Sequence, residues 1–129
     1  MIRNKKPLLL TIGIPTRNRS RELNRLLSFL SDEISMLVEN KVEILISDNA
    51  SIDDTPSVIE KFTMNFGYIK SVKNSENIGV DANINKILYE SKGKYVWTLG
   101  DDDYVVKGAI KKIIYSLEQY PKANYFFLN

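Results

Sequence analysis

Short apolar runs rich in β-branched and aromatic residues alternate along this chain with segments whose apolar residues recur every three or four positions. The runs cover residues 8–14, 42–46, 68–72, 95–99 and 125–128. The clearest helical stripes are Leu23 to Leu30 and Ile110 to Leu117. The runs predict strands and the stripes predict helices. Because parallel strands need a crossover, usually a helix, the alternation predicts an α/β fold with a doubly wound, mainly parallel sheet.

Composition limits the functions that this fold can serve. A chain of 129 residues that is 43% hydrophobic fits one globular domain with a real core. A net charge of only +2 gives no dense positive field, so we expect no nucleic-acid partner. The chain has neither cysteine nor histidine, so oxygen atoms must hold any metal ion.

The sequence predicts no transmembrane segment. The run at residues 8–14 is much shorter than the roughly 20 apolar residues that span a bilayer. The basic start, Met1 to Lys6, resembles the beginning of a signal peptide, but Pro7 and Pro15 bracket the run and no cleavage site follows. We expect a cytoplasmic protein, free or peripheral at the inner face of the membrane.

Polar clusters follow the first four predicted strands. They occupy residues 15–19, 47–51, 74–79 and 100–103. In open α/β sheets the ligand lies outside the carboxyl ends of the strands, so we expect the clusters to converge on one edge. The same residue types also form ordinary turns, and the third cluster alone fits either interpretation.

The fourth cluster carries three successive carboxylates, Asp101, Asp102 and Asp103, and the nearest basic residues in sequence are Lys94 and Lys107. Their mutual repulsion needs compensation. Mg²⁺ or Mn²⁺ supplies it, because these ions prefer oxygen ligands and are often held by one or two carboxylates plus substrate phosphates. A solvated acidic turn is the alternative.

The first cluster adds the opposite charge. Arg17 and Arg19 flank the amide of Asn18, a combination that suits an anionic or heterocyclic ligand. With the acidic cluster it suggests a metal-bound diphosphate. Neither Gly-x-Gly-x-x-Gly nor a Gly-Lys-Ser/Thr phosphate loop follows the first strand. Asp48, near the end of the second strand, keeps a nucleotide ligand open.

In their order and spacing, the four clusters resemble the inverting glycosyltransferase family 2 with the GT-A fold, whose members transfer sugars from nucleotide diphosphates. The resemblance covers nearly the whole chain. Residues 14–19 resemble the family's opening Pro-Thr-Tyr-Asn-Arg segment, and residues 47–55 resemble the segment whose first aspartate holds the base. Asn77-Ile78-Gly79 with Asn85 resembles its Asn-x-Gly stretch, and residues 99–103 resemble its Asp-x-Asp metal segment.

The resemblance implies a role for each matching residue. The implied nucleotide-sugar-binding residues are Pro15, Thr16, Arg17, Asn18, Arg19, Asp48, Asn77, Gly79 and Asp101. The implied metal frame is Asp101, Asp102 and Asp103, with Mg²⁺ or Mn²⁺ as the cofactor. By analogy Asp101 contacts the ribose and Asp102 chiefly the metal, while Asp103 is a second ligand or orients a metal-bound water.

Two positions depart from the family pattern. Arg17 stands where an aromatic residue usually stacks on the base, although a guanidinium plane can also stack. Gly100 stands where the commonest motif has its first aspartate, which leaves the metal frame ambiguous among the three aspartates.

The resemblance also implies what residues 1–129 contain. They correspond to the nucleotide-sugar (donor)-binding half of a truncated GT-A domain, with the acceptor-binding half absent and the catalytic base expected beyond Asn129. The donor is a nucleotide-diphosphate sugar, and the acceptor of the full enzyme is a sugar or a lipid-linked molecule. We therefore expect donor binding with little or no transfer. The tract from Tyr95 to Asp103 is similar to that of members making bacterial surface polysaccharides, including those that transfer dideoxyhexoses such as abequose.

Three other interpretations remain open. A flavodoxin-like regulatory module also clusters aspartates at strand ends, but it usually has its acidic pair after the first strand. A nucleotidyltransferase shares the architecture but needs a glycine- and lysine-rich loop there. A non-catalytic, nucleotide-binding glycosyltransferase-like domain is the third alternative.

Overall fold

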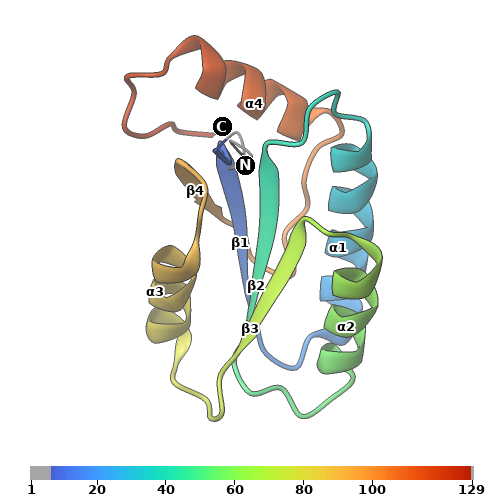
Figure 1. The fold of residues 1–129 in the computed structure, drawn as a ribbon. Helices are drawn as coiled ribbons and strands as arrows, with labels where there is room; N and C mark the ends of the chain where they lie inside the picture. Colours follow the sequence, from blue (N-terminus) through green and yellow to red (C-terminus); the bar gives the residue numbers. More distant parts are fainter. Residues whose placement is uncertain (1–6, 129) are drawn as a thin grey trace, which may run out of the picture.

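The computed structural model describes residues 7–128 as a parallel sheet flanked by helices (Figure 1). The strands are β1 (Leu10–Thr16), β2 (Val42–Asp48), β3 (Ile69–Lys73) and β4 (Tyr95–Thr98). The helices are α1 (Ser20–Ser35), α2 (Thr55–Asn65), α3 (Val80–Glu90) and α4 (Ala109–Gln119). The strand order is β3-β2-β1-β4, and every pairing is parallel. The predicted doubly wound α/β class is confirmed.

The two faces of the sheet have different coverings. Figure 1 shows α1 and α2 on one face and α3 on the other, with α4 across the end where β1 and β2 begin. Alternate residues of β1, namely Leu10, Ile12 and Ile14, enter a buried cluster with the apolar stripe of α1. This cluster is the main core, and it fixes the ends of β1 and β2 relative to α1.

The opposite face brings α3 unusually close to β1. A Cβ atom at Gly13 would lie 2.3 Å from Cγ2 of Ile87, a fully buried residue of α3. Only a residue without a side chain fits between the strand and the helix at this point. The close packing holds the start of α3 beside the carboxyl ends of β1 and β2.

The predicted fifth strand is wrong, because residues 125–128 form no strand. The ring of Phe126 packs edge-to-face on Tyr95 of β4, with centroids 5.6 Å apart, and lies 6.5 Å from the ring of Tyr120. Aromatic residues favour strands largely through such side-chain packing. Here the packing occurs without backbone pairing, so the composition was misleading.

Within residues 7–128, no helix is long and apolar enough to cross a membrane. The basic start from Met1 to Lys6, for which we predicted no signal-peptide role, lies outside the described residues.

Gly13→Ala tests the close approach of α3. We expect it to lower the free energy of unfolding by about 1–3 kcal/mol, because the added methyl group overpacks a site closed by Ile87. Urea denaturation measures the change. Gly67→Ala is the matched control, since a Cβ there meets nothing within 4 Å. Equal stability of the two variants would contradict the prediction.

Candidate functional site

A cleft of about 430 Å³ opens at the carboxyl ends of the strands. The loops after all four strands and the start of α3 form its walls. Most of the predicted site residues line it, namely Pro15, Thr16, Arg17, Arg19, Asn77, Gly79, Asp101 and Asp102. Asn18, Asp48 and Asp103 do not. The structure therefore brings basic and acidic clusters from opposite ends of the sequence to one cavity.

Asp101 is the buried member of the acidic turn, with 7% of its surface exposed. The Thr16 hydroxyl donates to its Oδ2 at 2.8 Å, and Arg19 Nε lies 3.8 Å from its Oδ1. Burial raises the pKa of the Asp101 carboxyl above its ordinary value, while Thr16 and Arg19 act in the opposite direction. Asp102 and Glu22, both negative, raise this pKa further. The floor of the cleft is thus a desolvated carboxyl that accepts hydrogen bonds.

Asp102 is exposed at the edge of the cleft and faces basic residues from the other end of the chain. Arg19 NH1 lies 3.0 Å from its Oδ2, and both side chains are at least half exposed. Arg25 of α1 donates to the main-chain oxygens of Asp102 and Asp103 at 3.1 and 3.3 Å, and its guanidinium lies over the Tyr104 ring. Two arginines therefore supply part of the compensation for which the sequence suggested a metal ion.

Asp103 folds back onto its own turn. Its Oδ2 accepts the Gly100 N–H at 2.8 Å, and its own N–H donates to the Gly100 oxygen at 3.1 Å. Among residues 7–128, no three Asp, Glu, His or Cys side chains are grouped so that they could hold a metal ion.

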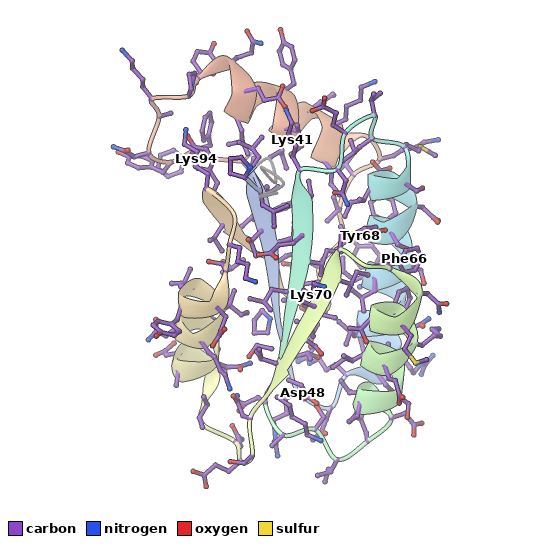
Figure 2. The ribbon with its side chains drawn as sticks, viewed as in Figure 1. Lys41, Asp48, Phe66, Tyr68, Lys70 and Lys94 are labelled. Carbon is purple, nitrogen blue, oxygen red and sulfur yellow. The ribbon has the colours of Figure 1, made fainter. Side chains whose placement is uncertain are left out.

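Asp48 faces a different hollow. It shares the face of β2 that carries Ile44 and Ile46, and it lines a space of about 240 Å³ with Pro56 and Ile59 of α2. Figure 2 shows it where β2 ends. It is 2% exposed, and its Oδ1 accepts the Ser51 N–H at 3.1 Å. Its Oδ2 is buried and has no hydrogen-bond partner among residues 7–128, a rare condition for a buried oxygen.

Arg17 is hydrogen-bonded to the main chain of the loop after β2. Its NH1 donates to the main-chain oxygens of Asn49 and Ala50 at 2.6 and 2.9 Å. Ala50 has φ 57°, in the left-handed region that non-glycine residues rarely adopt. Asn18, with φ 51°, ties the same loops together, because its Oδ1 accepts the Ile52 N–H at 2.8 Å. Arg17 and Asn18 thus stabilise the loops that shape the cleft. Their predicted contacts with a nucleotide stay predictions.

The sequence did not reveal the amide-rich wall beside α3. Asn49 and Asn83 line the cleft, whereas Asn85, which we had singled out, is exposed on α3. One signal was available. Asn83 lies one helical turn before Ile87, so the two residues must share the face of α3 that meets the sheet.

Comparison with known proteins agrees with the family resemblance seen in the sequence. The chain matches the model of glycosyl transferase family 2 over residues 11–127. It is 34% identical over 104 residues to the abequosyltransferase RfbV of Salmonella typhimurium, a match that covers 80% of this chain and 31% of that protein.

Two solved structures share the fold. S. aureus TarS 1–349 in complex with UDP-GlcNAc superposes with a TM-score of 0.78 at 22% identity, covering 88% of this chain and 32% of that one. The mannosyltransferase PcManGT from Pyrobaculum calidifontis, in complex with GDP-Man and Mn²⁺, gives 0.74 at 20% identity, covering 88% and 33%. The chain spans about a third of the length of these relatives.

The Asp101 carboxyl predicts a specific pH dependence of stability. A carboxyl whose pKa is raised by folding binds its proton more tightly in the folded state, so its contribution to stability is present below the unfolded pKa of about 3.9 and is lost as the pH rises through the folded pKa. Asp101→Asn removes this loss. Urea unfolding of both proteins should favour the variant increasingly as the pH rises above about 4; a constant difference would contradict the assignment.

Proposed function

This chain belongs to glycosyl transferase family 2, and from that premise we propose that residues 1–129 form the nucleotide-sugar (donor)-binding half of an inverting GT-A enzyme. The observation that carries the proposal is the cleft, which is lined by Arg17 and Arg19 after the first strand and by Asp101 and Asp102 after the fourth. Paired basic and acidic groups suit a diphosphate with its counter-ion.

The buried carboxyl of Asp101 suits a neutral donor such as a ribose hydroxyl. The Thr16 hydroxyl already donates to one of its oxygens, and Arg19 lies farther from the other. A ribose hydroxyl would add a hydrogen bond to an acceptor that burial has partly removed from water. This arrangement supports the ribose role proposed for Asp101.

Asp102 is the residue best placed to share a divalent cation, Mg²⁺ or Mn²⁺, with the diphosphate. One or two carboxylates plus substrate phosphates is the common arrangement for these ions, so a group of three is not required. The ion pair of Asp102 with Arg19 is at least half exposed on both sides. Such pairs contribute only about 0–1 kcal/mol, so Asp102 can exchange partners at little cost. A bound cation would offset the charge on the departing diphosphate.

Asp48 remains our proposed base-binding residue, although it faces the hollow beside α2. Its orphan Oδ2 supports the proposal, because a ring N–H of the base that reached this oxygen would satisfy it. The two structural relatives hold nucleotides with different bases, so the titration below includes several.

Titration calorimetry with UDP, CDP, GDP and dTDP, with and without Mn²⁺, tests the proposal. We expect one or more of them to bind, and to bind more tightly with Mn²⁺. Binding of none of the four would contradict the proposed function.

Two variants separate the proposed roles within the same titration. Asp102→Asn should remove most of the Mn²⁺ enhancement, because a carboxamide is a much weaker ligand for the ion. Asp48→Ala should weaken binding about tenfold with or without Mn²⁺. Asp32→Asn, at an exposed position of α1, is the charge-matched control. Wild-type behaviour of both site variants would show that the site is misplaced.

We further propose that residues 1–129 bind the donor without transferring its sugar at enzyme rates. The attacking hydroxyl must lose its proton to a base within about 3 Å. By the family resemblance, that base and the acceptor site belong to the other half of the enzyme. The full enzyme would act on a sugar or lipid-linked acceptor in bacterial surface polysaccharide synthesis, at the cytoplasmic side. A coupled assay for nucleoside diphosphate release, with added sugar acceptors, should give only background hydrolysis. Turnover at ordinary enzyme rates would contradict this proposal.

A further inference from the structure

Four asparagine side chains form a continuous hydrogen-bond network between the strand ends and α3. They are Asn49, Asn74, Asn77 and Asn83. Asn49, Asn74 and Asn83 are buried, and Asn77 is exposed. Asn49, Asn77 and Asn83 line the cleft, whereas Asn74 does not.

Lys86 joins the network at Asn74. Its Nζ donates to Asn74 Oδ1 at 2.7 Å. An ammonium group can only donate, so Asn74 must present its oxygen to Lys86. Its Nδ2 then donates to Asn49 Oδ1 at 3.1 Å and to Asn83 Oδ1 at 2.9 Å, which uses both of its N–H groups. The Lys86 ammonium and the two asparagine oxygens therefore favour the same orientation of this buried amide.

Asn49 passes this direction on to Asn77. Its Oδ1 accepts from Asn74 and from the Ile78 N–H, so its Nδ2 donates to Asn77 Oδ1 at 2.8 Å and to the Gly79 oxygen at 3.4 Å. Asn77 Oδ1 also accepts the Gly79 N–H at 3.0 Å. The oxygen of Asn77 is thus engaged inside the network. Its Nδ2 has no hydrogen-bond partner within residues 7–128 and belongs to a residue that lines the cleft.

We propose that Lys86 and Asn74 are positioning residues that orient Asn49 and, through it, Asn77, so that this wall offers N–H donors to the oxygen atoms of the bound nucleotide sugar. The inference rests on the proposed function. A reversed Asn77 amide would turn a carbonyl oxygen toward a ligand rich in oxygen acceptors, and the two would repel. The acceptor is an oxygen of the diphosphate or of a sugar hydroxyl.

The first test uses the ligand-free protein and needs no nucleotide. Lys86→Met removes the donor and keeps the side-chain length, Lys86→Arg keeps donors, and Lys92→Met removes the same charge from an exposed lysine. NMR of the asparagine side chains should show the amide signals of Asn74, Asn49 and Asn77 displaced in Lys86→Met and unchanged in Lys92→Met, with Lys86→Arg close to wild type. An unchanged Asn77 signal in Lys86→Met would overturn the inference, whether or not nucleotides bind.

The second test asks whether Lys86 acts through Asn77. Affinity for UDP-GlcNAc, or for a nucleotide sugar of whichever of the four diphosphates the wild type binds, should fall about tenfold in Lys86→Met with Mn²⁺ present. In an Asn77→Ala background the same substitution should have little further effect, because its target is already gone. Equal losses in both backgrounds would indicate a general structural effect and overturn the inference.

Comparing the diphosphate with the nucleotide sugar shows which ligand oxygen accepts from Asn77. It also separates this inference from the proposed function. A loss seen already with the diphosphate assigns the Asn77 donor to phosphate oxygens, and a loss seen only with the corresponding nucleotide sugar, such as UDP-GlcNAc, assigns it to the sugar. A wild type that binds no nucleotide contradicts the proposed function, and the NMR comparison then still decides whether Lys86 orients Asn77.

Discussion

The parallel pairing of β1 with β2 on one side and β4 on the other is the constraint on which the site depends. The pairing continues past the strands, since the Asn49 N–H donates to the Thr16 oxygen and the Leu99 N–H to the Gly13 oxygen, both at 2.9 Å. Parallel strands end at one edge, so loops far apart in sequence must meet there. Thr16 and Asp101, 85 residues apart, share a 2.8 Å hydrogen bond for this reason. Loosening β1 would separate the walls of the cleft without changing any residue in it.

This constraint also determines how the acidic turn is stabilised. The turn follows β4, and α1 follows β1, so the start of α1 must pass beside the aspartates. Arg19 and Arg25 reach them from there. Since exposed ion pairs contribute little, these arginines moderate the repulsion without closing the site to a stronger ligand. The cleft is therefore shaped in advance, while the charges at its edge remain exchangeable.

The sequence allowed the fold and the location of the cleft to be predicted, because strand and helix periodicities are local and the position of a ligand in a parallel sheet follows from topology. It did not allow us to predict which side chains bond to the residues of the site. Arg25 lies 77 residues from Asp102 in the chain, whereas Lys94, which is near in sequence, donates to the Pro121 oxygen elsewhere. The strand predicted at residues 125–128 is wrong for a related reason. Strand propensity is local, but a strand needs a neighbouring strand with which to pair.

Buried polar groups at the strand ends differ in hydrogen bonding between the two faces of the sheet. Beside α3, both N–H groups and the oxygen of Asn74 and of Asn49 are engaged, which favours a rigid wall. Beside α2, Asp48 Oδ2 is buried and finds no partner in the described part of the chain, and an unsatisfied group of this kind costs about 1–3 kcal/mol. A ligand gains differently from each side. The satisfied wall reduces the ordering that binding requires, whereas a ligand N–H that reached Asp48 would recover an interaction that the free protein lacks.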